Sequence, residues 1–164
     1  PLNSKTRPTK DMVRQGIFNA ISPDIYGKTV LDLFAGSGAM GIEAISRGAL
    51  KAFFVDRDAS AISCIKKNLT SLKIESSEVF AMDAQKALDL FVTQKIVFDI
   101  VFLDPPYADD VFDLLIQRLI NDGLLATNGI IVLENQKPIL PEFYAFRKIK
   151  NYHYGITDVT ILWR

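Results

Sequence analysis

Short apolar runs alternate along the chain with segments whose apolar residues recur at helical spacing. The runs are rich in β-branched and aromatic residues and are bounded by Gly, Asp or Pro, which is typical of buried strands. They predict strands at residues 29–34, 52–55, 78–82, 99–103 and 130–134. The segments between them predict helices at residues 38–47, 59–72, 84–93 and 110–120. This alternation favours a parallel sheet covered by helices on both faces.

Both ends of the chain extend this pattern. Residues 9–21 have apolar side chains at helical spacing, and Thr9 or Asp11 can cap a helix that packs over one end of the sheet. Residues 143–154 and 156–163 predict two strands that meet at Gly155 and form an antiparallel hairpin at the sheet edge. We therefore expect an α/β fold: one doubly wound, mostly parallel, Rossmann-like sheet of seven strands, in a single domain over residues 1–164.

The charge balance changes this picture little. The chain has 164 residues, 49% of them hydrophobic, with 19 basic and 19 acidic residues, so its total charge gives no sign of nucleic-acid binding. The first 14 residues and residues 137–150 are nevertheless each net +3. A nucleic acid would have to be held by these two basic segments, although the same charges suit an ordinary solvated surface.

Cysteine and histidine usage points away from redox and metal chemistry. The single cysteine, Cys64, lies among apolar residues at helical spacing, so we expect it to pack against the core. The single histidine, His153, lies in the predicted hairpin, and we expect neither histidine base catalysis nor a metal site. No stretch resembles a membrane span or a signal peptide, so we expect a soluble cytoplasmic protein with no membrane partner.

A glycine-rich turn follows the first predicted strand. Gly36, Gly38 and Gly41 form a GxGxxG motif, in which glycines let the backbone turn sharply and let a ligand approach the main chain. Asp56 lies 20 residues after Gly36, at the end of the next strand, where a carboxylate can accept hydrogen bonds from both hydroxyls of a ribose. These features alone suit a dinucleotide-dependent enzyme equally well.

Two further carboxylates favour a different ligand. Asp32 lies inside the first strand, where it would repel a pyrophosphate but can engage the ammonium of an amino acid. Asp83 ends the third strand and can accept a hydrogen bond from the amine of adenine. Ribose, adenine and a cationic amino acid together describe S-adenosyl-L-methionine, although capping of helices or turns would also explain these aspartates. The predicted cofactor-binding residues are Asp32, Phe34, Ala35, Gly36, Gly38, Asp56, Arg57, Asp83 and Ala84.

The fourth predicted strand leads to Asp104-Pro105-Pro106-Tyr107 at the carboxyl edge of the sheet, where open α/β sheets bind ligands. The prolines stiffen the loop and remove two amide donors. We expect the Asp104 carboxylate and the Pro105 carbonyl to accept both hydrogens of an exocyclic amine, which directs its lone pair at a methyl sulfonium. Tyr107 offers a face on which a flipped-out base can stack. We therefore predict that these four residues are catalytic; the alternative is a loop that simply ends the strand.

These motifs carry a family resemblance. The glycine turn and the 104–107 tetrapeptide resemble class I amino-methyltransferases. With Arg7-Pro8-Thr9, Val13-Arg14 and Phe18-Asn19, the chain is similar along nearly its whole length to bacterial small-subunit ribosomal RNA guanine-N2 methyltransferases. The resemblance implies a guanine N2 target, S-adenosyl-L-methionine as donor, ribosomal RNA or a small-subunit assembly particle as partner, and Arg7, Thr9 and Arg14 near the substrate. That family usually begins with a basic strand-turn-strand, which we expect to be absent here.

Other interpretations remain open. The tetrapeptide chemistry serves any planar amine, so adenine N6 of DNA or RNA and a protein glutamine are alternative targets, although the chain leaves no room for a DNA-reading domain. The GxGxxG motif alone also fits a nicotinamide-dependent oxidoreductase or a non-catalytic nucleotide-binding module. Lys10 can meet phosphate or the cofactor carboxylate, or be a surface residue. Glu134 either borders the base pocket or stabilises a turn, and Trp163 is expected in the core.

Overall fold

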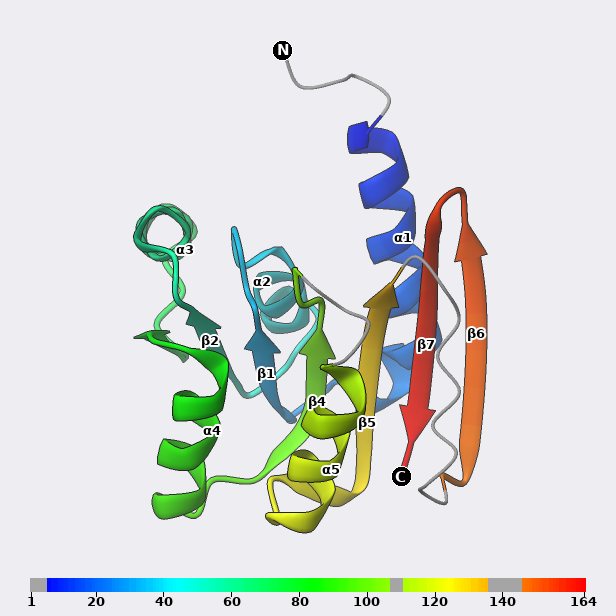
Figure 1. Cartoon of the computed structure of the whole chain (residues 1–164). Helices are drawn as coiled ribbons and strands as arrows, with labels where there is room; N and C mark the ends of the chain where they lie inside the picture. Colours follow the sequence, from blue (N-terminus) through cyan, green and yellow to red (C-terminus); the bar gives the residue numbers. More distant parts are fainter. Residues whose placement is uncertain (1–5, 107–110, 136–145) are drawn as a thin grey trace.

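The computed structural model describes residues 6–106, 111–135 and 146–164, with side chains from residue 10 onward. Within these residues seven strands form one sheet in the order β3-β2-β1-β4-β5-β7-β6 (Figure 1). The strands are β1 (Thr29–Leu33), β2 (Lys51–Asp56), β3 (Ser77–Ala81), β4 (Phe98–Leu103), β5 (Leu125–Asn135), β6 (Lys148–Tyr154) and β7 (Thr157–Trp163). The helices are α1 (Thr6–Ile21), α2 (Ala39–Ser46), α3 (Ala59–Ser71), α4 (Ala84–Thr93) and α5 (Phe112–Asn121), with a 3-10 turn η1 (Ser22–Asp24).

The sheet is mostly parallel, as predicted. Strands β1 to β5 run parallel to one another, whereas β7 is antiparallel to both β5 and β6. The predicted hairpin therefore exists, but its second strand lies inside the sheet, between β5 and β6. The burial of the two strands explains this order, because six of the seven β7 residues are buried, whereas most β6 residues are exposed.

Helices cover both faces of the sheet. The apolar side chains of α4 and α5 pack with one set of strand residues, which includes Phe53 and Leu133. The side chains of α1, α2 and α3 pack on the opposite face, against residues such as Phe54 and Phe102. Phe53 and Phe54 point to opposite faces because successive residues of a strand alternate. The doubly wound architecture predicted from the sequence is confirmed.

Helix α1 lies along the α2 side of the sheet, and its amino-terminal half extends past the carboxyl edge of the strands (Figure 1). Its apolar stripe includes Val13, Ile17 and Phe18, and the ring of Phe18 lies 5.5 Å from that of Phe102. The helix begins at Thr6, so the expectation that Thr9 or Asp11 caps it is wrong. Asp11 is instead one turn inside the helix and pairs with Arg14.

The predicted elements differ from the structure mainly at their ends. Strand β5 has 11 residues, more than predicted, because it continues past a register shift opposite Phe98 and Ile100. The expectation that Cys64 packs in the core is wrong, because Cys64 is exposed while Ile62, Ile65 and Leu69 form the buried stripe of α3. Trp163 is buried, as predicted.

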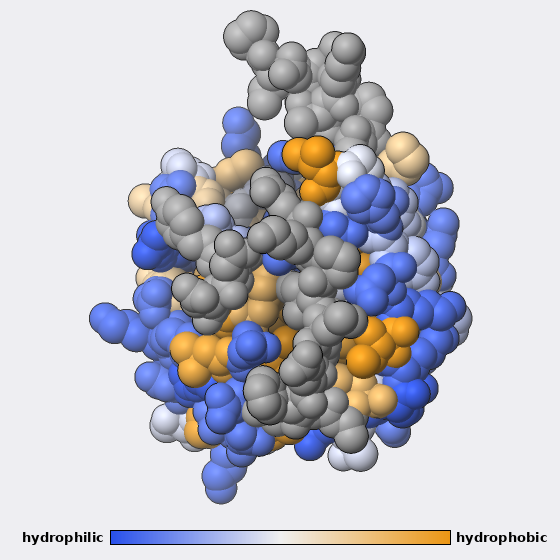
Figure 2. All heavy atoms as spheres, turned by 45° about the vertical axis from the view of Figure 1, so that its right-hand side comes forward, coloured by the Kyte–Doolittle hydropathy of each residue, from blue (hydrophilic) through white to orange (hydrophobic). Residues whose placement is uncertain are grey.

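The β6 edge is largely hydrophilic. In a view turned by 45° from that of Figure 1, polar side chains cover much of the visible described surface, with apolar side chains among them (Figure 2). Lys148 and Lys150 lie on this edge strand, and charged side chains of this kind oppose pairing with another sheet. Among the described helices, none has the length and apolar character needed to cross a bilayer.

Candidate active site at the carboxyl edge of the sheet

The turn after β1 has a backbone shape that most side chains avoid. Phe34, Gly36 and Gly38 have φ values of 70°, 58° and 82°, all in the left-handed region. For a bulky residue such as Phe34 this region is strained, and strained residues of this kind concentrate at functional sites. The N–H groups of Phe34 and Ala35 both donate to the Val55 carbonyl oxygen, at 3.1 and 2.9 Å. Strand β2 therefore fixes the shape of the glycine turn.

Asp56, at the end of β2, lies against this turn. Its Oδ2 atom accepts a hydrogen bond of 2.9 Å from the Gly36 N–H, and its Oδ1 atom accepts one of 2.9 Å from the Asp58 N–H. A carboxylate oxygen has two lone-pair sites, so both oxygens retain accepting capacity for a ligand. The sequence placed Asp56 beside Gly36, and the structure brings the two together.

Asp32 is a buried carboxylate beneath the glycine turn. Its Oδ2 atom accepts a hydrogen bond of 3.0 Å from the Gly41 N–H in the first turn of α2. Burial, and to a smaller extent the nearby charges of Glu134, Asp104 and Asp56, raise the pKa of Asp32 to about 7, although the hydrogen bond from Gly41 lowers it. Helix α2 approaches β2 closely here, because a Cβ atom on Gly41 would overlap the ring of Phe54.

Carboxylates from three neighbouring strands meet at the carboxyl edge. Leu103 of β4 pairs with Leu133 of β5, so Asp104 and Glu134 leave adjacent strands side by side. Burial and the charge of Asp104 raise the pKa of Glu134 to about 7, while Lys10 lowers it. Desolvation also raises the pKa of Asp104, and Lys10 again opposes the shift. This edge attracts a cationic ligand and repels a pyrophosphate.

The start of the tetrapeptide lies at this edge. Asp104 is exposed, Pro105 is buried and Pro106 is exposed, so the carboxylate faces outward while the first proline anchors the loop. Tyr107 lies outside the described residues. Sequence and structure agree on where this loop leaves β4, immediately after Leu103.

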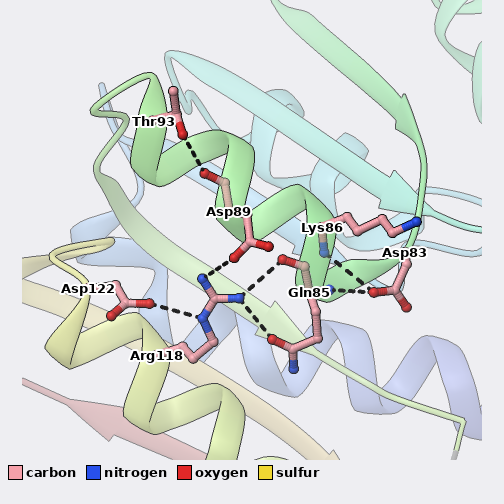
Figure 3. Close-up of polar contacts among 7 residues, drawn as sticks. All are labelled: Asp83, Gln85, Lys86, Asp89, Thr93, Arg118 and Asp122. Atoms are coloured by element: carbon pink, nitrogen blue, oxygen red, sulfur yellow. Dashed lines mark hydrogen bonds and ion pairs between the residues drawn. The ribbon is translucent and has the colours of Figure 1, made fainter.

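Asp83 begins α4 as its N-cap. Its Oδ2 atom accepts hydrogen bonds from the N–H groups of Gln85 at 3.0 Å and Lys86 at 3.4 Å, and its Oδ1 atom takes no part in these contacts (Figure 3). Capping therefore accounts for one carboxylate oxygen, and the other retains its capacity to accept hydrogen bonds. Ala84 is the buried first residue of α4, and Arg57 is exposed just after β2.

An arginine from α5 holds the first turns of α4. Arg118 donates to the Gln85 backbone carbonyl at 3.1 Å, to its Oε1 atom at 3.0 Å, and to Asp89 at 2.7 Å (Figure 3). Its Nε atom donates to Asp122 at 3.0 Å. The sequence analysis missed this residue, because 33 positions separate Arg118 from Gln85 and no local pattern links them.

Of the three predicted substrate-binding residues, only Arg14 has a described side chain. Arg7 and Thr9 lie in α1, and their side chains are outside the described part of the structure. Arg14 forms an i,i+3 ion pair of 3.2 Å with Asp11 on α1. The cation that acts on the site carboxylates is Lys10, which the sequence left open together with Glu134. The signal for Glu134 was its position at the end of the fifth predicted strand.

Two other polar groups lie outside the cluster of site carboxylates. One is at the amino ends of the strands, and the other is at the carboxyl edge beyond Asn135 of β5, which pairs with Asp158. A hollow of about 490 Å³ is lined by Lys28, Asp99 and Arg147, and it lies at the amino ends of β1 and β4, remote from every predicted site residue. His153 pairs with Asp158 across the β6-β7 hairpin at 2.9 Å. Neither group joins the carboxylates of the candidate site.

Comparisons with known proteins show the family of the chain. The family model described as Conserved hypothetical protein 95 matches residues 1–163. The chain belongs to this family. It is 38% identical over 156 residues to the Ribosomal RNA small subunit methyltransferase D of Haemophilus influenzae, which covers 91% of this chain and 80% of that protein. The predicted membership of the small-subunit ribosomal RNA methyltransferase family is confirmed.

Solved structures confirm the class I methyltransferase fold. A conserved hypothetical protein from Streptococcus pyogenes superposes with a TM-score of 0.83 at 38% identity, covering 92% of this chain and 94% of that one. The protein SMU.776, solved as a complex with SAH, gives a TM-score of 0.72 at 17% identity, covering 92% of this chain and 49% of that one. At this lower identity the likeness concerns the fold alone.

Proposed function

We propose that the chain is an S-adenosyl-L-methionine-dependent methyltransferase that methylates the exocyclic N2 of a guanine in small-subunit ribosomal RNA. The observation that carries the proposal is the meeting of Asp32, Asp56 and Asp104 around the glycine turn at the carboxyl edge of the sheet. The relatives of the chain are named as methyltransferases of ribosomal RNA, and this family membership supports the substrate class.

The cofactor is expected to lie along the ends of β1, β2 and β3. Asp32 would balance the positive charge of its amino-acid part, and Asp56 would accept from its ribose hydroxyls. The free Oδ1 atom of Asp83, with Ala84 beside it, would receive the adenine. The backbone of residues 34–38 would follow the amino-acid part, and Arg57 would border the adenosine. When bound, S-adenosyl-L-methionine supplies a methyl group on a positively charged sulfur.

The loop after β4 would make the target amine reactive. An exocyclic amine is a poor nucleophile because its lone pair is delocalised into the ring. If the Asp104 carboxylate and the Pro105 carbonyl each accept one of its hydrogens, the lone pair points toward the methyl group. The nitrogen would form a bond to the methyl carbon while the bond from that carbon to sulfur breaks, with the electron pair left on sulfur. The nitrogen would lose one proton, which Asp104 is placed to accept because its pKa is raised. Tyr107 would stack on the flipped-out base.

Basic residues of α1 would hold the RNA. We propose that Arg7, Thr9 and Arg14 contact the substrate, together with Lys10, which already acts on the site carboxylates. The partner would be ribosomal RNA or a small-subunit assembly particle in the cytoplasm. Basic side chains hold RNA mainly through its phosphates. Such contacts do not depend on base sequence and weaken as salt rises, so we expect the affinity for RNA to fall with ionic strength.

Calorimetry and a catalytic variant test the proposal together. We expect S-adenosylhomocysteine to bind and NAD not to bind; micromolar binding of NAD alone would overturn the assignment. Asp104→Ala should keep its affinity for S-adenosylhomocysteine while losing turnover, because the carboxylate contacts the substrate amine. Glu78→Gln is the matched control, since Glu78 pairs with Lys51 at the opposite edge of the sheet. Near-normal turnover in the Asp104 variant would remove the mechanism.

The target base is tested in cells. Mass mapping of methylated nucleosides in small-subunit RNA should show an N2-methylguanosine that is lost when the protein is absent and returns when it is expressed again. Methylation of adenine N6 or of a protein glutamine in its place would identify one of the alternative targets, because the tetrapeptide chemistry is the same for each.

A further inference from the structure

We infer that Glu134 makes the proposed active site selective for guanine over bases that lack an N1 hydrogen, by accepting a hydrogen bond from the guanine N1–H while Asp104 and Pro105 hold the exocyclic amine. The inference rests on the proposed function and assigns a role to a residue outside the tetrapeptide and the glycine turn.

The sheet register places Glu134 beside the tetrapeptide. Leu103 pairs with Leu133, and neighbouring parallel strands lie about 4.8 Å apart, so the residue after each leucine leaves the sheet next to the other. Glu134 also pairs with Val159, which is buried on the α1 side of the sheet. Paired residues share a face, so the Glu134 side chain points to the face that also holds Asp32 and the start of α1.

The surroundings of Glu134 leave it with accepting capacity. It is half-buried at the end of β5, and no described side chain or backbone group donates a hydrogen bond to it. Lys10 is the cation that acts on it, and Asp104 is its like-charged neighbour. A half-buried carboxylate beside a like charge is costly unless a donor reaches it, and here a ligand can bring that donor to Glu134.

The Watson–Crick edge of guanine carries the right donors. Its N1–H and its N2 amine are adjacent, so a base whose amine is held at Asp104 presents N1–H to the neighbouring strand end. Adenine and 2-aminopurine have an unprotonated N1, which is an acceptor. At pH 8 or above, where Glu134 is charged, this N1 would face the carboxylate with no shared hydrogen, so the comparison is made at that pH. An acceptor opposite an acceptor leaves both groups unpaired, at a cost of about 1–3 kcal/mol.

A simpler explanation is that Glu134 only pairs with Lys10 and steadies the end of β5. In that case its replacement would change the stability of the protein or its overall turnover, and it would not change the preference between two bases. The preference is therefore the quantity to measure.

The experiment compares guanine with 2-aminopurine, which keeps the exocyclic 2-amine but lacks the N1 hydrogen. Small-subunit RNA is ligated with either base at the methylated position, and kcat/KM is measured for the full chain. We expect the unaltered protein to prefer guanine by about 10- to 100-fold. Glu134→Gln should lower kcat/KM for guanine and bring the ratio close to one, because the amide can donate to an N1 acceptor.

Affinity for S-adenosylhomocysteine should change little in Glu134→Gln, and the melting temperature should not fall, because the amide removes a desolvated charge. Glu78→Gln should keep the preference of the unaltered protein. An unchanged preference in Glu134→Gln would overturn the inference. Equal turnover of both bases by the unaltered protein would also overturn it, whether or not the variant folds. Failure of the unaltered protein to methylate guanine N2 at all would instead refute the proposed function.

Discussion

The carboxylate of Asp32 accepts a hydrogen bond of 3.0 Å from the backbone N–H of Gly41, which joins the middle of β1 to the first turn of α2. Gly41 donates from a helix that lies directly on the Phe54 ring, so the position of this N–H is fixed by packing. The contact offsets part of the cost of burying Asp32 but does not remove it, because the pKa of Asp32 still rises to about 7. A buried carboxylate of this kind is suited to a cationic ligand.

Asp32→Asn should separate stability from binding. Asparagine keeps an oxygen that can accept from Gly41 but cannot become charged, so at pH 8 we expect the ligand-free variant to melt at a higher temperature than the unaltered protein. Affinity for S-adenosylmethionine should fall by about 10- to 100-fold, since a charged partner is lost. Calorimetry and thermal unfolding measure the two effects. Unchanged affinity would show that Asp32 does not contact the ammonium.

The stability of the ligand-free protein should depend on pH with a definite sign. The folded-state pKa of Asp32 is raised above its ordinary value, so the folded protein binds this proton more tightly than the unfolded chain does. Stability from this group is therefore fully present below about pH 4 and declines as pH rises to about 7, by on the order of a few kcal/mol. Glu134, whose pKa is also raised to about 7, should lower the stability over the same pH range.

Turnover should rise with pH, whereas the stability of the ligand-free protein should fall. If the carboxylates at the site must be charged, turnover falls as pH drops through about 7, because Asp32 and Glu134 become protonated. Desolvation raises the pKa of Asp104 as well, so its protonation acts in the same direction. The positive charge of Lys10 opposes these shifts and holds the pKa values of Asp104 and Glu134 closer to their ordinary range. A pH–rate profile of kcat/KM measures the effect, and a flat profile between pH 6 and pH 8 would contradict the assignment.

Asp56→Ala should weaken cofactor binding. Its carboxylate lies against Gly36 and is the proposed acceptor for the ribose hydroxyls, and loss of hydrogen bonds to a charged group costs about 1.5–3 kcal/mol each. We expect at least a tenfold weaker dissociation constant for S-adenosylhomocysteine in calorimetry. Asp58→Ala is the matched control, because Asp58 caps α3 by accepting from Ser60, and its loss should lower stability only. Equal affinities in both variants would refute the ribose role.

Arg118→Ala should loosen the first turns of α4. The guanidinium binds Gln85, Asp89 and Asp122 at once, and Gln85 in turn donates to Asp83 (Figure 3). We expect a loss of about 1–3 kcal/mol of stability and a weaker affinity for S-adenosylhomocysteine. Arg118→Lys should recover little, because an ammonium lacks the planar fork of donors.

Lys51→Ala provides the control for Arg118→Ala. Lys51 forms a comparable ion pair with Glu78 at the amino ends of β2 and β3, away from the candidate site. It should lower stability slightly and leave affinity for S-adenosylhomocysteine unchanged. If Arg118→Ala also leaves this affinity unchanged, the Arg118 cluster supports the fold and does not position the adenine pocket.

The sequence by itself determined the order of helices and strands and the elements that carry the aspartates. The runs at β1, β2 and β4 are continuous and apolar, and Asp56 and Asp104 stand at strand ends while Asp32 interrupts β1. These are local properties, because side-chain periodicity and turn-forming residues lie within a few positions of the elements they define. Parallel strands then bring their carboxyl ends to one edge, so the neighbourhood of Asp32, Asp56 and Asp104 followed from order alone.

Tertiary structure decided what depends on residues distant along the chain. The insertion of β7 between β5 and β6, the exposure of Cys64, the contact of Arg118 with Gln85 and the place of Glu134 beside Asp104 all depend on which apolar faces meet. Local periodicity fixes which side of an element is apolar but not its partner, because the free energy of burial depends on area and not on the identity of the covering surface.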